Sequence, residues 1–233
     1  MQPVFPVPAP VCVPLAGEAR VLPVRRIFCV GRNYAEHARE MGAEDQASGR
    51  EPPFFFSKPA DALVAGEGEL SIAYPPRTAN LHHEVEMVVA LGAGGAEVTV
   101  DAAAGLIFGY AVGLDLTRRD LQARAKEKSH PWDMSKGFDQ SAVCGPLLPV
   151  ARCGHPEHGA IVLQVNGDVR QSGDLVEMMW KVPQIIAELS TFVRLEAGDL
   201  IYTGTPAGVG PLQRGDRLQA TVAGLAPLNA RIV

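Results

Sequence analysis

Residues 81–89 of this chain read Leu81-His82-His83-Glu84-Val85-Glu86-Met87-Val88-Val89, an apolar run that carries two glutamates. In a β-strand, side chains at positions i and i+2 point to the same side, roughly 7 Å apart. Glu84 and Glu86 therefore project together, while Val85 and Met87 face the core. Two carboxylates this close repel each other unless a cation lies between them. The pattern predicts a strand and a site for a hard ion such as Mg²⁺, Mn²⁺ or Ca²⁺. The alternative is a solvent-facing strand edge.

A third carboxylate, Asp115, lies near the end of the apolar segment Leu106–Leu116, which is typical of a second strand. Burying a carboxylate there is costly unless it is paired or bound to a metal. The alternative is that Asp115 caps the helix that follows it. We expect that helix to run to about Lys128, with Thr117 as its N-cap.

His37 and Glu40 lie three residues apart in a segment of helical propensity, Tyr34–Met41, which ends at Gly42. Residues at this spacing share one face of a helix. A carboxylate beside an imidazole fixes its tautomer and raises its basicity, as a general base requires. An exposed helical pair is the alternative. The polar stretch that follows, Ala43–Glu51, indicates a mobile loop.

The rest of the chain favours short strands and turns. The dipeptide Asn166-Gly167 between apolar residues predicts a β-hairpin. Pro183 predicts the start of a helix with Ile185, Ile186, Leu189 and Val193 along one stripe. Further strands are expected at Arg26–Val30, Val85–Leu91, Ile161–Val165, Leu200–Thr203 and Leu218–Val222.

Composition narrows the functional classes. The 233 residues are 47% hydrophobic and 20% charged, which is typical of a soluble globular protein. The net charge of −5, without any basic block, argues against nucleic acid as a partner. The proline-rich start lacks the positive region of a signal peptide and the length of a membrane span. Four cysteines without zinc-site spacing indicate free thiols in a reducing cytoplasm.

A glycine-rich run, Thr203-Gly-Thr-Pro-Ala-Gly-Val-Gly210, follows a predicted strand. Its backbone N–H groups and Thr205 could face an anion, although the run matches neither a Walker A loop nor a dinucleotide fingerprint. An ordinary turn is the alternative. Three cations, Arg32, Arg119 and Lys136, flank these segments. The sequence lacks the Gly-x-Ser-x-Gly elbow of a serine hydrolase.

Several of these motifs together resemble the fumarylacetoacetate hydrolase superfamily, in order from about Arg25 to the C-terminus. They are Cys29-Val-Gly-Arg-Asn-Tyr-Ala-Glu-His37, Lys58-Pro, His82-His-Glu-Val-Glu86, Gly113-Leu-Asp-Leu-Thr117, Arg119-Asp-Leu-Gln122 and Thr203-Gly-Thr-Pro-Ala-Gly-Val-Gly210. The run Arg50-Glu-Pro-Pro-Phe-Phe-Phe-Ser-Lys-Pro-Ala-Asp-Ala62 is most similar to the acylpyruvase branch, which includes bacterial fumarylpyruvate hydrolases.

The resemblance implies an α+β, mostly β, mixed roll with short flanking helices. It implies one catalytic domain over residues 25–233, preceded by a proline-rich extended segment over 1–24. A lid is expected at about residues 37–51. The resemblance also implies one Mg²⁺ or Mn²⁺ bound by Glu84, Glu86 and Asp115, and a cytoplasmic homodimer.

The resemblance further implies roles for the other polar residues. His37 and Glu40 match the catalytic dyad, and Lys136 and Gln122 match residues that stabilise an oxyanion. Thr205 matches a substrate-side threonine, and Arg32 or Arg119 would hold a far carboxylate.

The implied activity is hydrolysis of the C–C bond of an acylpyruvate, a small 1,3-diketo acid. Fumarylpyruvate, cleaved to fumarate and pyruvate in the gentisate pathway of aromatic catabolism, is the expected substrate. Decarboxylation or keto–enol tautomerisation, as with oxaloacetate, is the alternative at the same site. A non-catalytic metal- or anion-binding module is a further alternative, but such a module does not need a base.

Overall fold

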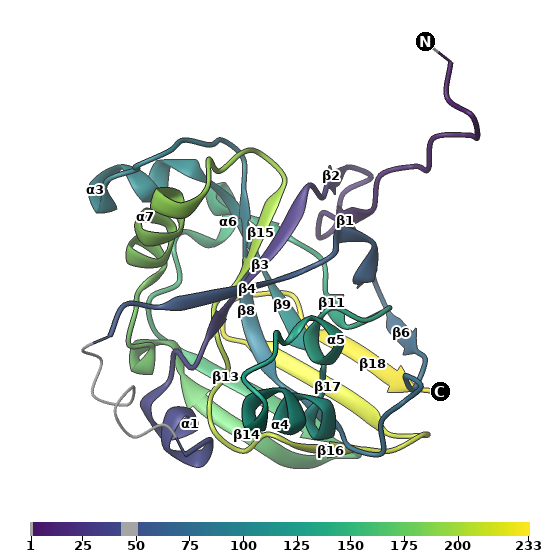
Figure 1. The fold of residues 1–233 in the computed structure, drawn as a ribbon. Helices are drawn as coiled ribbons and strands as arrows, with labels where there is room; N and C mark the ends of the chain where they lie inside the picture. The colour runs from purple at the N-terminus through teal and green to yellow at the C-terminus, as the bar shows by residue number, and fades with distance from the viewer. Residues whose placement is uncertain (1, 43–50) are drawn as a thin grey trace.

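A mixed β-sheet forms the centre of the molecule (Figure 1). The computed structural model describes residues 2–42 and 51–233. The strands of the central sheet follow the order β4 (Phe54–Lys58), β3 (Arg26–Gly31), β15 (Asp199–Tyr202), β8 (Val85–Leu91), β9 (Ile107–Asp115), β11 (Ala142–Cys144) and β5 (Leu63–Ala65), with β12 (Leu148–Pro149) beside β9. β3 and β15 run parallel, whereas β8 is antiparallel to both β15 and β9. The long strands β8 and β9 therefore lie at the middle of the sheet.

A second sheet packs against the first through the main hydrophobic core. Its strands follow the order β14 (Asp168–Asp174), β13 (Ala160–Val165), β17 (Arg217–Val222), β18 (Leu228–Ile232) and β6 (Glu69–Ile72). The predicted hairpin is confirmed, because β13 and β14 are joined at Asn166 and Gly167, whose φ angles of 54° and 89° suit a tight hairpin turn. A small third sheet orders β10 (Thr117–Arg118), β7 (Leu81–His83) and β16 (Gly210–Leu212).

Strand β8 is buried along its whole length. Met87 and Val89 belong to the core between the two sheets. Val88 and Ala90 face a second apolar cluster, which includes Val13. That residue comes from a hairpin of β1 (Cys12–Pro14) and β2 (Val21–Pro23), within the segment predicted to be extended. Glu84 and Glu86 consequently lie in the interior and not on an exposed strand edge.

The helices are short and flank the sheets. They are α1 (Ala35–Glu40), α3 (Val100–Ala103), α4 (Arg119–Glu127), α5 (Asp133–Lys136), α6 (Val150–Cys153) and α7 (Val182–Phe192), with 3-10 turns at Ala60–Ala62, Ala104–Leu106 and Leu175–Glu177. Pro183 lies in the first turn of α7, and Ile185, Ile186 and Leu189 are buried, as predicted, whereas Val193 follows the end of the helix. Among the described residues, none of the helices is long and apolar enough to cross a membrane.

Two local predictions, the cap at Thr117 and the loop at Ala43–Glu51, are not confirmed. The predicted Thr117 cap is wrong, because Thr117 pairs with His82 in β10 and its hydroxyl donates to the carbonyl oxygen of Asp115. Helix α4 begins only at Arg119. The predicted loop at Ala43–Glu51, and with it much of the predicted lid, lies largely outside the described residues. The expected mixed, mostly β architecture with short flanking helices is confirmed.

Candidate metal centre and active site

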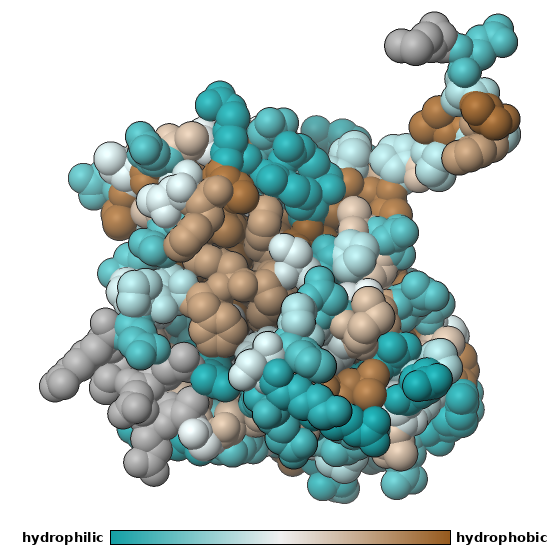
Figure 2. All heavy atoms as spheres, viewed as in Figure 1, coloured by the Kyte–Doolittle hydropathy of each residue, from teal (hydrophilic) through white to brown (hydrophobic). Residues whose placement is uncertain are grey.

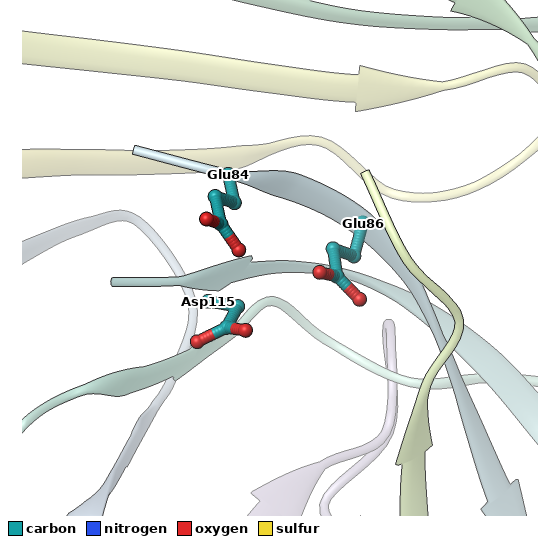
Figure 3. A group of neighbouring side chains, drawn as sticks. All are labelled: Glu84, Glu86 and Asp115. Carbon is teal, nitrogen blue, oxygen red and sulfur yellow. The ribbon is translucent and has the colours of Figure 1, made fainter. Parts of the chain in front are cut away.

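Three carboxylates meet where the chain passes from β7 into β8. The antiparallel register pairs Val85 with Leu114, so that Glu84 lies opposite Asp115, whose backbone N–H donates to the Glu84 carbonyl at 2.9 Å. Glu86 follows two residues along the same face. One carboxylate oxygen of each residue lies within 4.8 Å of those of the other two (Figure 3). All three residues are buried.

Three cations compensate these charges. Lys136 Nζ lies 2.7 Å from a carboxylate oxygen of Glu84 and 2.7 Å from one of Asp115. Arg119 pairs with the other oxygen of Glu84, and Lys58 pairs with Asp115. Burial would raise the pKa of Glu84, but the charges of Lys136 and Arg119 hold it well below its usual range.

Glu86 has a different environment. Burial and the neighbouring charges of Asp115 and Glu84 raise its pKa well above the usual range. Its Oε2 accepts a hydrogen bond from the N–H of Gly204 at 2.6 Å. A cation placed among the three carboxylates would stabilise the charged form of Glu86.

The donor atoms fit a divalent cation. Oδ1 of Asp115 is buried and accepts no hydrogen bond from the described residues, although Lys58 Nζ is 2.7 Å away. An all-oxygen set of three carboxylates suits Mg²⁺ or Mn²⁺ rather than a softer metal. Glu84, Glu86 and Asp115 therefore form a group that can hold such an ion.

The predicted dyad is also assembled. Nδ1 of His37 lies 3.0 Å from Oε2 of Glu40, one turn along α1. The N–H of Gly208 donates to the same carboxylate at 3.2 Å. Burial would raise the pKa of Glu40, but the hydrogen bonds from His37 and Gly208 outweigh it and lower the pKa. Glu40 is therefore ionised at neutral pH and orients the imidazole of His37.

The glycine-rich loop after β15 connects the dyad to the carboxylate group. Two of its amides donate to the protein's own carboxylates, Gly204 to Glu86 and Gly208 to Glu40. Gly204 has a φ of +96°, and a Cβ there would lie 2.6 Å from the Cβ of Asn33. Only glycine suits this position. The loop thus fixes the distance between the two halves of the site.

One cavity collects nearly all of the predicted residues. Its lining includes Arg32, His37, Glu84, Glu86, Asp115, Arg119, Gln122, Lys136 and Thr205. Glu40 lies behind His37 and contacts it directly. Arg119 also donates to the Gln122 side-chain oxygen at 2.6 Å. Its guanidinium therefore contacts both Glu84 and Gln122 in the inner part of the site. The hydroxyl of Thr205 donates to the carbonyl of Val85 and holds the loop on β8.

Two buried residues at the site were given no role from the sequence, although Lys58 belongs to one of the motifs that carry the resemblance. Lys58 follows Phe54-Phe55-Phe56-Ser57, and a lysine ending such an apolar run is a signal for a paired buried charge. Gln171, in β14, accepts from the Val85 N–H at 3.0 Å and donates to Thr205 at 2.7 Å. Nothing local in the sequence marks Gln171, because its partners are remote along the chain.

The chain is similar to several known proteins. The chain is 46% identical over 182 residues to a fumarylpyruvate hydrolase of a Ralstonia species, covering 78% of this chain and 93% of that protein. It is 42% identical over 203 residues to an oxaloacetate tautomerase of Escherichia coli, covering 87% and 90%. A crystal structure of fumarylpyruvate hydrolase from Pseudomonas aeruginosa with Mn²⁺ and pyruvate superposes with a TM-score of 0.96 at 49% identity, covering 100% and 99%.

The similarity to these relatives supports the fold and the interpretation of the three carboxylates as a group that can hold a metal ion. The family model described as fumarylacetoacetate (FAA) hydrolase C-terminal matches residues 26–233. That range contains the three carboxylates, the dyad and the glycine-rich loop. On this match and these identities, the chain belongs to the fumarylacetoacetate hydrolase family.

Proposed function

We propose that this protein is a Mg²⁺- or Mn²⁺-dependent hydrolase that cleaves the C–C bond of acylpyruvates, with fumarylpyruvate as its substrate. The observation that carries the proposal is that His37, paired with Glu40, lines the same cavity as Glu84, Glu86 and Asp115. A carboxylate-oriented imidazole can take a proton from water, a step that hydrolysis requires and that loss of CO₂ from oxaloacetate does not.

The residues divide the reaction between them. A divalent cation held by the three carboxylates supplies the Lewis acidity that the 2-oxo acid end requires. His37, with Nδ1–H donating to Glu40, accepts a proton from water at Nε2. The resulting hydroxide attacks the distal carbonyl carbon of the substrate. The bond to the methylene carbon then breaks, and its electron pair passes to the enolate of pyruvate. The proton held by His37 returns to that carbon, and fumarate and pyruvate leave.

Two further side chains stabilise the negative charge that develops at the attacked carbonyl. The oxygen of Gln122 is occupied by Arg119, so its amide NH₂ group is the end available to donate. Lys136 supplies a buried ammonium group in the same cavity. Hydrogen-bond donors fixed in advance around a developing oxyanion lower the barrier because they do not have to reorganise.

Tautomerisation or decarboxylation of oxaloacetate is the second candidate, favoured by the 42% identity to the Escherichia coli tautomerase. Neither reaction needs an activated water, although tautomerisation needs a group that moves a proton between C3 and the 2-oxygen. Hydrolysis and decarboxylation therefore differ in their dependence on His37.

The test is turnover of fumarylpyruvate and of oxaloacetate, followed by loss of the enol absorbance, with and without Mg²⁺. We expect metal-dependent hydrolysis that falls by about 10²–10⁴-fold in His37→Ala, the range a general base supplies. Glu36→Ala, an exposed change on the same helix, is the control. Near-native hydrolysis in His37→Ala, or turnover of oxaloacetate alone, would overturn the proposal.

We also propose that the protein is a homodimer. Figure 2 shows apolar side chains gathered on the face that β4 crosses in Figure 1. β4 is the edge strand of the central sheet, and Phe192, which contacts Phe55 of β4, is 68% exposed. Exposed apolar edges of this kind mark association surfaces. Sedimentation should show a dimer that Phe192→Glu weakens, and a monomer at all concentrations would contradict this.

The place of the enzyme in metabolism follows from the same substrate. We propose a cytoplasmic role in the gentisate branch of aromatic catabolism, where fumarylpyruvate would be consumed. Deleting the gene should abolish growth on gentisate and leave growth on pyruvate intact.

A further inference from the structure

Two cations that do not pair with the metal-binding carboxylates line the same cavity as those carboxylates. Lys126 reaches it from α4, and Arg32 reaches it from the residue after β3. Both side chains are partly buried. Neither belongs to the inner cluster, where the three carboxylates are paired with Lys58, Lys136 and Arg119.

Aromatic rings hold these outer cations. The ammonium of Lys126 lies 5.6 Å from the centroid of the Trp132 ring, and the guanidinium of Arg32 lies 5.7 Å from that of Phe54. The two rings contact each other edge to face, with centroids 5.6 Å apart. A ring face attracts a cation without neutralising it. Lys126 forms no ion pair with any carboxylate that the structure describes.

The charge of Lys126 is therefore not compensated within this part of the protein. Its burial, together with the positive charges of Arg32 and Arg119, lowers its pKa to about 8. The inner cluster balances three carboxylates with three cations, and a divalent ion adds positive charge to it. An anionic ligand that reaches Lys126 would relieve this excess.

We propose that Lys126 binds the terminal carboxylate of a dicarboxylic substrate whose 2-oxo acid end lies at Glu84, Glu86 and Asp115. This inference rests on the proposed function and deepens it, because it assigns the residue that selects acylpyruvates with a second carboxylate. Arg32 contacts Phe54, the ring beside Trp132, and adds a second positive charge that stabilises the same terminal carboxylate. Lys126 is a specificity-determining residue and takes no part in bond cleavage.

The test uses two ligands that cannot be hydrolysed, 2-oxoheptanedioate and 2-oxoheptanoate. They differ only in the terminal carboxylate, and neither has the second carbonyl that water attacks. Binding is measured by calorimetry on the Mn²⁺-loaded full chain at pH 7. A charge-assisted hydrogen bond corresponds to roughly a tenfold to hundredfold change in affinity. We expect wild-type protein to prefer the diacid by that factor.

Lys126→Met should bring this preference to within about threefold and leave binding of 2-oxoheptanoate unchanged, since one charge-assisted bond is removed. Lys126→Arg should keep the preference. The matched control is Arg124→Met, which removes an exposed charge from the same helix and should also keep it.

The proposal is overturned if wild-type protein does not prefer the diacid, if Lys126→Met keeps the preference, or if that variant loses both ligands equally. Failure of the proposed function gives a different result. In that case fumarylpyruvate is not hydrolysed, while the preference for the diacid and its dependence on Lys126 can still be measured.

Discussion

Lys58 Nζ lies 2.7 Å from Oδ1 of Asp115, and the two side chains are 0% and 1% exposed. The same ammonium donates to the backbone carbonyls of Leu116 and Lys136. The ammonium of Lys58 therefore connects β4 both to the end of β9 and to helix α5. A buried charge pair of this kind is costly to break because the remaining partner keeps an uncompensated charge.

Lys58→Met should therefore destabilise the metal-free protein by about 3–5 kcal/mol, the usual cost of removing one partner from a buried pair. Urea unfolding monitored by tryptophan fluorescence would measure this. Mg²⁺ should restore part of the loss, because it returns positive charge to Asp115. Arg20→Met removes an exposed partner of Glu18 and should have no measurable effect. Equal stability of the two variants would contradict the role of Lys58.

Asp115→Asn keeps the shape of the side chain but removes one of three charged metal ligands. We expect calorimetry to show loss of Mn²⁺ binding, with circular dichroism unchanged. Asp199→Asn is a matched control, because Asp199 is equally buried and pairs with Arg25 and Arg26 away from the cavity. That control should lose stability and keep Mn²⁺ binding. If Asp115→Asn binds Mn²⁺ as tightly as wild type, the ligand assignment is wrong.

Glu40→Gln retains an oxygen that can accept from His37 but removes the charge that stabilises its protonated form. Hydrolysis of fumarylpyruvate should fall by about tenfold or more, part of the 10²–10⁴-fold that a general base supplies. Any decarboxylation of oxaloacetate should stay within about twofold, because loss of CO₂ does not need a base that activates water. Steady-state rates for both substrates, with Glu36→Gln as the exposed control, check this. Equal losses in both reactions would argue against a role confined to water activation.

Gly204 and Gly215 both have φ angles of +96°, but only Gly204 lies against another backbone. Each alanine substitution carries the strain of a positive φ, about 1–3 kcal/mol. Gly204→Ala must also displace Asn33 or move the N–H that binds Glu86. We expect both variants to lose stability and Gly204→Ala alone to lose Mn²⁺ affinity. Unfolding and calorimetry on the pair separate the two effects, and equal Mn²⁺ affinities would contradict the expectation.

Lys126 gives a pH dependence of stability. Its pKa is about 8 in the folded protein against an ordinary value of 10.5, so the unfolded chain binds this proton more tightly. The charge therefore destabilises the folded state most below pH 8, and the penalty disappears as pH rises through 10.5. Metal-free Lys126→Met should be more stable than wild type at pH 7, and the gap should narrow by pH 9.5. A pH-independent gap in urea unfolding would contradict this.

The sequence identifies the carboxylate group well because its geometry is local. The spacing of Glu84 and Glu86 and the apolar run before Asp115 each point to a buried acid. The register of β8 on β9 brings them together, and two adjacent strands of this length pair readily. The resemblance to a family adds the dyad residues, which spacing alone leaves open.

Other features depend on contacts that spacing cannot reveal. Gln171 reaches His83 across 88 positions and lies on a hairpin whose alternation gives no sign of a buried polar side chain. Thr117 has the character of a helix cap, but pairing with His82 overrides that local preference. Lys126 is an ordinary helical lysine until Trp132 and the cavity are placed beside it. In each case tertiary structure decides the role.

The glycine-rich loop donates from Gly204 to Glu86 and from Gly208 to Glu40. It also connects two groups of residues that can change independently during evolution. The metal ligands belong to the interior of the protein, where Glu84 and Asp115 are paired with buried cations. The dyad belongs to the six-residue helix α1, where His37 is buried and Glu40 is partly exposed and accepts from the N–H of Gly208. A lineage can therefore lose water activation through one change in the dyad and still keep the metal site, whereas loss of a metal ligand would remove the ion on which both reactions depend. On this account, we expect relatives with different reactions to differ first in α1 and last in β8.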